Sequence, residues 1–176
     1  MRVLRVTATG ASNASARLSI RPYAPDDWEA IARVHDAARM QELTASVGPE
    51  AFLDLAATAE GEGLFDGEVW VAVADEGVVG FVAYDDAEVT WLYVHPEAQR
   101  RGTGRALLRR ALRHAEENDV TTVEVTVLEG GPARGLYESE GFTLTETRTG
   151  RLVGNEAFTA TGHILHRTTR PGRAAE

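Results

Sequence analysis

Two glycines stand among arginines in the middle of the chain, in the segment Gln99-Arg100-Arg101-Gly102-Thr103-Gly104. The segment follows an apolar run and precedes residues at helical spacing, so it predicts a loop that leads into a helix. The first N–H groups of a helix have no partner within it and lie at the positive end of its dipole. Glycine lets a ligand approach this backbone closely, because it has no Cβ. The pattern therefore indicates a phosphate or pyrophosphate ligand, with Arg100, Arg101 and Arg105 neutralising its charge.

The other interpretation of this segment is a surface helix whose arginines are solvated. Paired glycines lower the stability of a helix, however, and this favours a ligand. A P-loop does not fit, because it requires a lysine and the chain contains none. A dinucleotide-binding fold does not fit either. Its fingerprint requires a third glycine, and this chain has Leu107 at that position. Glu124 has the spacing of the ribose-binding acid of such a fold, but it falls within an expected strand.

The glycine segment resembles the Q/R-x-x-G-x-G/A pattern of the GNAT superfamily of acyl-CoA N-acyltransferases. Two other segments extend the resemblance: Val94-His95-Pro96 before the loop, and Leu136–Phe142 in the pattern L-Y-x-x-x-G-F after it. The order of the expected elements resembles the superfamily over roughly residues 17–167. One position departs from the pattern, because many members carry Asn where this chain has Gly130. Contacts to the donor at the end of the fifth strand are therefore expected to differ.

The resemblance implies an α+β fold with a central, mostly antiparallel mixed sheet of about seven strands and about four flanking helices. The fourth and fifth strands would splay apart around the pantetheine arm of acetyl-CoA, the usual acyl donor. The backbone amides from Arg100 to Gly104 would hold the pyrophosphate. Contacts to the donor are predicted for Leu92, Tyr93, Val94, Gln99, Arg100, Arg101, Gly102, Thr103, Gly104 and Arg105.

Acylation of an amine requires a neutral nitrogen. A lysine-like amine, with a pKa near 10.4, is about three units from its neutral form at pH 7, a cost of roughly 4–5 kcal/mol. A nearby carboxylate therefore assists. Glu88, six residues before Val94, stands where some members of the superfamily place this base, and it would act through a water molecule. The alternative is a carboxylate at the rim, beside Asp85 and Asp86, with no proton to accept. Asp86 is the second candidate base.

The departing thiolate, with a pKa of about 8.5, needs only modest help from an acid. The resemblance places Tyr137 beside the sulfur, with its hydroxyl as the proton donor. The alternative is a helix tyrosine packed against Phe142 with its hydroxyl in water. The oxyanion would be stabilised by a backbone N–H between Leu92 and Val94 on the splayed strand.

The acceptor side carries weaker signals. Trp91 and Tyr93 share one face of their strand and form either core or the wall of an acceptor tunnel, with core favoured. The acidic segment from Thr44 to Glu68 lies where the superfamily builds its acceptor wall, which favours a cationic amine. Acid-rich surface loops, however, are commonly only solvated.

The five histidines do not indicate a metal site. His163 and His166 are three apart on an expected strand and so face opposite sides, while His35, His95 and His114 stand alone. All five are interpreted as structural or solvated, and no metal is expected.

The helices and strands that position these residues are predicted from the spacing of apolar residues and from turn-forming residues between the apolar runs. Three runs joined by tight turns predict antiparallel hairpins, and a helix after Gly104 returns the chain to a strand parallel to the last of them. Strands are predicted at Leu18–Arg21, Glu68–Ala74, Val78–Tyr84, Glu88–Val94, Thr121–Leu128, Phe142–Thr147 and Ala157–His166. Helices are predicted after Asp27, after Pro49, after Gly104 and from Pro132 to Glu140.

Length and composition limit the class of protein. The chain has 176 residues, no cysteine and a net charge of −9, so one domain is expected, without disulfides or a thiol nucleophile. The charge is uneven: residues 26–88 carry 16 acids and 2 arginines, whereas residues 99–113 carry 6 arginines and no acid. Neither nucleic acid nor membrane is an expected partner. Without an apolar signal segment the chain is expected to be cytoplasmic. Residues 1–16 are expected to form a flexible arm, 17–168 the domain and 169–176 a tail.

Together these features predict an N-acetyltransferase that transfers an acetyl group from acetyl-CoA to a primary amine by direct attack in a ternary complex. The acceptor would be a small cationic amine or the amine of a peptide or protein, and a homodimer is a further expectation. The alternative is a non-catalytic acyl-CoA-binding domain of the same fold.

Overall fold

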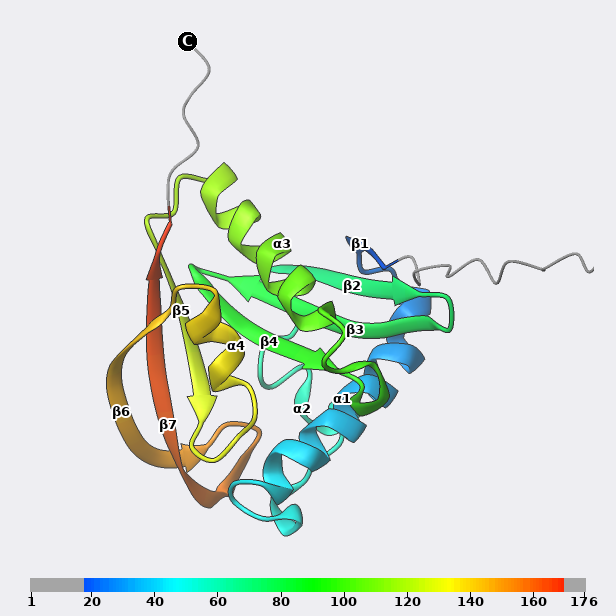
Figure 1. Ribbon diagram of the computed structural model, residues 1–176. Coiled ribbons are helices and arrows are strands. Elements are labelled where there is room, and N and C mark those ends of the chain that lie inside the picture. Colours follow the sequence, from blue (N-terminus) through cyan, green and yellow to red (C-terminus); the bar gives the residue numbers. More distant parts are fainter. Residues whose placement is uncertain (1–17, 170–176) are drawn as a thin grey trace, which may run out of the picture.

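The computed structural model describes residues 18–169 (Figure 1). The predicted arm, 1–16, and all but the first residue of the predicted tail lie outside this range. The helices are α1 (Trp28–Thr44), α2 (Leu55–Thr58), α3 (Thr103–Glu117) and α4 (Arg134–Ser139). The strands are β1 (Ser19–Pro22), β2 (Glu68–Ala74), β3 (Gly77–Asp85), β4 (Glu88–Val94), β5 (Thr122–Leu128), β6 (Thr143–Leu152) and β7 (Asn155–Thr168). Over residues 18–169, no helix combines the length and apolar character needed to cross a membrane.

The seven strands form one mixed sheet in the order β1-β2-β3-β4-β5-β7-β6. All neighbours are antiparallel except β4 and β5, which are parallel because α3 connects them. These two strands share one residue pair, Glu88 with Glu124, and then diverge (Figure 1). The predicted mixed sheet and its splayed fourth and fifth strands are therefore confirmed.

Helices cover both faces of the sheet. On one face α3 buries the predicted apolar stripe against β2, β3, β4 and β5. Its buried residues are Leu107, Leu108, Ala111, Leu112 and Ala115. On the other face α1 and α2 pack Ile31, Val34 and Leu55 against Val71 and Phe81. These two cores hold β4 rigidly from both sides.

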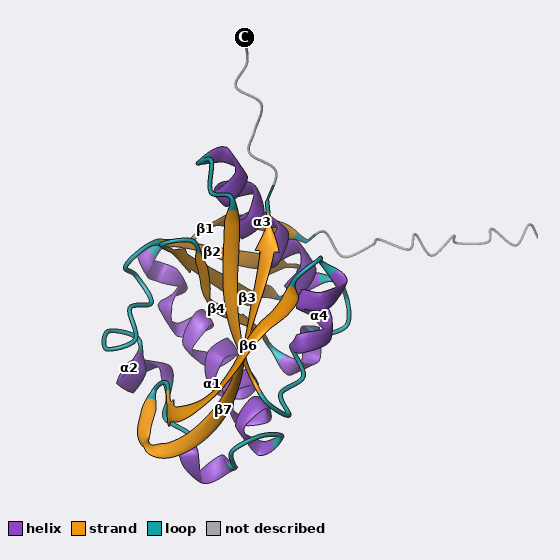
Figure 2. Cartoon of the chain, turned by 90° about the vertical axis from the view of Figure 1, so that its left-hand side faces the viewer, coloured by secondary structure: helices purple, strands orange, loops and turns teal. Residues whose placement is uncertain are grey.

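The closing hairpin is confirmed but is longer than predicted. β6 continues to Leu152 and β7 begins at Asn155, because backbone pairing continues through a stretch that buries almost nothing. A strand without a buried face lacks the alternation from which it is recognised in a sequence. Figure 2 shows the hairpin curving toward α2. At its tip, the Asn155 side-chain amide donates to the Ala51 carbonyl at 3.0 Å.

Candidate active site

Two cavities lie beside the splayed strands. The first, named here the hairpin cavity, has a volume of about 610 Å³ and lies between α1, β4, β5 and the β6–β7 hairpin. The second, named the loop groove, has a volume of about 570 Å³ and lies between α1, β4, the loop 99–102, the start of α3 and α4. Glu42 and Tyr93 line both cavities. These two side chains therefore form the boundary between them.

The glycines of the loop give the groove its shape. Gly102 precedes the first residue of α3 with a φ of +87°, in the left-handed region that favours glycine. A Cβ on Gly104 would lie 3.2 Å from Leu136 Cδ2 and 3.7 Å from Val94 Cγ2, on the floor between α4 and β4. The first turn of α3 thus exposes its N–H groups to the groove without a side chain at Gly104. This is the geometry that an anionic group requires.

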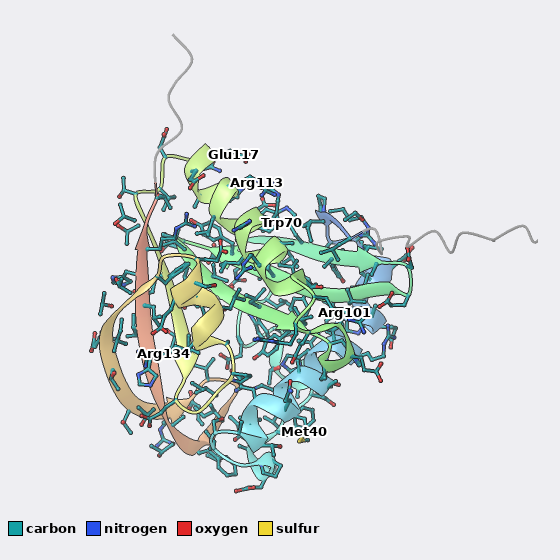
Figure 3. All side chains as sticks on the ribbon, in the orientation of Figure 1. Met40, Trp70, Arg101, Arg113, Glu117 and Arg134 are labelled. Carbon is teal, nitrogen blue, oxygen red and sulfur yellow. The ribbon has the colours of Figure 1, made fainter. Side chains whose placement is uncertain are left out.

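The structure brings most of the predicted donor contacts together. Eight of the ten residues line the loop groove: Leu92, Tyr93, Val94, Gln99, Arg100, Gly102, Gly104 and Arg105. Thr103 does not, because its side chain is buried and its hydroxyl donates to the Ala98 carbonyl at 3.5 Å. Arg101 is exposed outside the groove, beside the start of α3 (Figure 3).

The arginines of the groove are not equally available. Arg105 lies within 2.8 Å of Glu140, a carboxylate that it shares with Arg109. The neighbouring guanidinium of Arg109 is the main reason that the pKa of Glu140 lies below its usual range. Arg105 therefore brings a partly neutralised charge, and the ionised Glu140 fixes α4 to α3.

The edge of β4 that faces β5 offers free backbone groups. The N–H of His95 donates to the Val79 carbonyl of β3 at 2.9 Å. Because the backbone N–H groups of successive residues in a strand point to opposite edges, the residues on either side of those that bond to β3 direct their N–H groups away from β3. The N–H groups of Leu92 and Val94 consequently point toward β5. Across the described strands, β5 pairs with β4 only at Glu88. The Gln99 side-chain amide covers the Val94 carbonyl at 3.0 Å.

A β-bulge in β4 determines which way Glu88 points. Ala83 pairs with Trp91 and Tyr84 pairs with Val89, so Thr90 is the extra residue. Without the bulge, Glu88 would share the α3 face with Leu92. With it, Val89 takes that face and Glu88 lines the hairpin cavity beside Trp91. Trp91 and Tyr93 both pack in the core, as favoured, and line this cavity as well.

The two predicted proton-transfer groups lie in different surroundings. Burial raises the pKa of Glu88, and the charges of Glu124 and Asp85 add to the effect. Asp86, the second candidate base, is exposed at the β3–β4 turn and lines neither cavity. Tyr137 is 5% exposed, packs edge-on against Phe142 and lines neither cavity. Burial, and then the charge of Glu42, raise the pKa of Tyr137.

Three polar residues of α1 face the hairpin cavity: His35, which the sequence interprets as structural or solvated, and Arg39 and Glu42, which it does not single out. Arg39 donates to Glu42 Oε2 at 2.6 Å and to the Val153 carbonyl at 3.0 Å, so it connects α1 to the tip of the hairpin. The Tyr93 hydroxyl donates to the same carboxylate oxygen at 3.3 Å. Their spacing of four and three residues is a helical stripe on the inward face. Polar residues on an inward helical face were the available signal.

His35 is buried rather than solvated. Its Nδ1 lies 2.9 Å from Asp36 Oδ1, and its ring lies edge-on to Tyr93 at 5.0 Å. Burial lowers the pKa of His35, so the ring is neutral at pH 7. Within residues 18–169, no group of three or more His, Asp or Glu side chains is arranged to hold a metal ion.

The wall of the hairpin cavity carries both signs of charge. Of the acidic segment from Thr44 to Glu68, only Glu62 brings a carboxylate to it. In total the lining contains three glutamates and three arginines: Glu42, Glu62, Glu88, Arg39, Arg148 and Arg151. The expected acidic wall is therefore a mixed one, and it favours a cationic acceptor less than the sequence suggests.

Packing against α1 explains why residue 130 is a glycine. Its φ is +82°, and a Cβ would lie 2.7 Å from the Ala45 carbonyl oxygen at the end of α1. The loop between β5 and α4 therefore lies directly against α1, with no room for the Asn side chain found in many members of the superfamily.

Comparison with known proteins agrees with this geometry. The family model of the acetyltransferase (GNAT) domain matches residues 65–144, which contain β4, the loop, α3 and α4. The chain is 27% identical over 128 residues to the uncharacterised N-acetyltransferase YafP of Escherichia coli, covering 71% of this chain and 81% of that protein.

Two solved structures share the fold. One is a GCN5-related N-acetyltransferase from Rhodopseudomonas palustris, with a TM-score of 0.72 and 19% identity, covering 85% of this chain and 94% of that one. The other is yncA, a putative acetyltransferase from Salmonella typhimurium solved with acetyl-CoA, with a TM-score of 0.62 and 23% identity, covering 90% and 98%. Residues 65–144 therefore match the acetyltransferase (GNAT) domain, and the chain has the fold of these N-acetyltransferases.

Proposed function

We propose that this protein is an N-acetyltransferase that transfers the acetyl group of acetyl-CoA to a primary amine. The observation that carries the proposal is the pair of cavities on the two sides of the splayed strand β4, with a common boundary at Glu42 and Tyr93. A donor in one cavity and an acceptor in the other would meet at this boundary. Direct transfer needs such a meeting point and no covalent intermediate on the protein.

The loop groove is proposed as the donor site. The N–H groups at the start of α3, with Arg100 at the rim, suit the pyrophosphate of acetyl-CoA. The N–H groups of Leu92 and Val94 suit the amide carbonyls of a pantetheine arm and the oxyanion of the tetrahedral intermediate. The acetyl-CoA complex of yncA, a protein of the same fold, supports this choice of donor.

The hairpin cavity is proposed as the acceptor site. Glu88 would accept a proton from the incoming ammonium through water, which frees the nitrogen lone pair. The nitrogen attacks the thioester carbonyl, the C–S bond breaks, and Tyr137 gives its hydroxyl proton to the sulfur. Burial raises the pKa of Tyr137, so its hydroxyl is protonated before the C–S bond breaks.

The test is the release of free CoA thiol from acetyl-CoA with a panel of amines: spermidine, kanamycin, lysine and a short peptide. The chain has no cysteine, so the protein adds no thiol to a colorimetric assay. Amine-dependent release is expected. A rise in melting temperature with acetyl-CoA but no release with any amine would favour the non-catalytic acyl-CoA-binding domain instead.

The proposed roles of Glu88 and Tyr137 are tested by Glu88→Gln and Tyr137→Phe. Each change should lower kcat by about 10- to 100-fold, because each removes one proton-transfer group. The KM for acetyl-CoA should stay within about threefold, since Glu88 lies outside the loop groove and Tyr137→Phe removes a single hydroxyl that acts only when the C–S bond breaks. Unchanged rates in both variants, and in the double variant, would show that these assignments are wrong.

A further inference from the structure

Glu42 is the one residue of α1 that lines both of the cavities proposed to hold the substrates. It lines the hairpin cavity and the loop groove, and among the described residues it shares this property only with Tyr93. Glu88 lies at the opposite end of β4, five residues before Tyr93. At the rise of a β-strand the Cα atoms of Glu88 and Tyr93 are about 16 Å apart. A proton that leaves the amine at the boundary therefore meets Glu42 first.

The two oxygens of Glu42 have different surroundings. Oε2 accepts hydrogen bonds from Arg39 at 2.6 Å and from the Tyr93 hydroxyl at 3.3 Å. No residue in the range 18–169 donates to Oε1, and it is not among the enclosed polar atoms that lack a partner. A Cβ on Gly131 would lie 3.9 Å from Oε1, so this oxygen faces the loop between β5 and α4. Oε1 is thus open to a ligand, while Oε2 is held.

The plainer role for Glu42 is structural. Its pair with Arg39 is 17% and 14% exposed and joins α1 to β4 and to the hairpin tip. A purely structural pair, however, would gain from having both oxygens satisfied. Glu42 also acts electrostatically on both tyrosines of the site, because its charge contributes to the raised pKa of Tyr93 and of Tyr137.

We propose that Glu42 is the carboxylate that binds the acceptor ammonium at the boundary of the two cavities and takes its first proton on Oε1. The proposal rests on the proposed N-acetyltransferase function. Arg39 is a positioning residue, since it acts by holding Oε2. Glu88 is then the next acceptor, through water, on the way to solvent.

The protons balance in this scheme. The ammonium loses one proton to Glu42, which passes it through water toward Glu88 and out of the cavity. The nitrogen then attacks the thioester carbonyl carbon, and the C–S bond breaks. Tyr137 protonates the sulfur, and the second proton released by the nitrogen on amide formation restores the Tyr137 hydroxyl. One proton therefore leaves for each amide and each CoA thiol formed.

The experiment compares Glu42→Gln, Glu88→Gln and the control Glu29→Gln, which removes a charge from an exposed position on the same helix. The probe is whichever of spermidine, kanamycin, lysine and the short peptide gives the highest wild-type rate. Glu42→Gln should lower kcat/KM for the amine about 100-fold at pH 7. At pH 10 the loss should shrink to about tenfold, because about a quarter of a lysine-like amine, with a pKa near 10.4, is already neutral there. The loss in Glu88→Gln should be smaller at pH 7.

A structural role for Glu42 would lower the rate equally at both pH values. That result, or a rate within threefold of Glu29→Gln at pH 7, would overturn the proposal, as would a larger loss in Glu88→Gln. If Glu42→Gln melts at a lower temperature, Glu42→Asp keeps the charge but withdraws the carboxylate by one methylene. A rate within threefold of wild type for Glu42→Asp would also overturn it. An inactive wild type would instead defeat the proposed function and this inference together.

Discussion

Of the residues proposed to move protons, Tyr137 is buried and Glu88 is half-buried, and the partial removal of a carboxylate from water has a measurable cost in stability. Glu88 is the clearest case, because no side chain described around it donates a hydrogen bond to its carboxylate, and two other acids lie near it. A carboxylate in such surroundings is a better base than one in water. The same surroundings make its ionised form less stable in the folded protein than in the unfolded chain.

Glu88→Gln should therefore raise the melting temperature at pH 7 while it lowers activity. The pKa of Glu88 is raised on folding, so the stability linked to this group is fully present below the unfolded pKa of about 4.3 and is lost as pH rises. The increase in melting temperature caused by Glu88→Gln should consequently be larger at pH 7 than at pH 4. Calorimetric melting at both pH values checks this. A variant that is less stable than wild type at pH 7 would show that the carboxylate has a stabilising partner.

At the scale of elements, the site depends on how α1 meets β4 and the loop between β5 and α4. Three contacts fix this arrangement: Arg39 with the hairpin tip, Gln99 with Gln41 at 2.9 Å, and the close approach of Gly130 to Ala45. Each joins α1 to a different neighbour. Glu42 lies on the same stretch of the helix, so the position of its carboxylate depends on all three contacts.

Gly130→Ala should destabilise the protein more than Gly77→Ala does. Both glycines have positive φ, +82° and +105°, but a Cβ at Gly77 has nothing within 4 Å, whereas one at Gly130 would meet the Ala45 carbonyl oxygen at 2.7 Å. The backbone cost common to both is about 1–2 kcal/mol. Gly130→Ala should add about 1–3 kcal/mol for displacement of α1. Urea unfolding of both variants measures the difference, and equal losses would contradict the packing reason given for Gly130.

The start of α3 is the second element on which the site depends. Gly104→Val would place methyl groups on the floor of the loop groove, where a Cβ already lies 3.2 Å from Leu136. Acetyl-CoA at 100 times its Kd stabilises a folded protein by about 2.7 kcal/mol. Wild type should therefore melt several degrees higher with acetyl-CoA, and Gly104→Val should lose this shift. An unchanged shift would place the donor elsewhere.

At the scale of the whole molecule, the sequence predicts best the strands that lie between tight turns. Glu68–Ala74 and Glu88–Val94 have the predicted bounds, because tight turns delimit them. The β4–β5 splay was reached only through the family resemblance. The face on which Glu88 lies could not be predicted, since it depends on the bulge at Thr90, which appears only when β3 and β4 pair.

The polar stripe of α1 was missed for a related reason. His35, Arg39 and Glu42 face inward because two cavities open beside the helix. Their helical spacing was the only local signal, and polar residues at that spacing are more commonly solvated. Residues 26–88 contain 16 acids, and the resemblance places the acidic segment from Thr44 to Glu68 at the acceptor wall, which favoured a cationic amine. The fold instead places most of these acids outside the hairpin cavity and brings in Arg148 and Arg151 from a distant hairpin.

The most direct test of the central claim is to follow the acetyl group itself. Acetyl-CoA with an isotopically labelled acetyl group is incubated with the protein and the amine panel, and the products are examined by mass spectrometry. One labelled acetyl is expected on the nitrogen of an acceptor, in amounts equal to the CoA released, with no labelled protein. Labelled acetate as the main product, an acetylated protein that then donates to the amine, or label remaining wholly on CoA would contradict it.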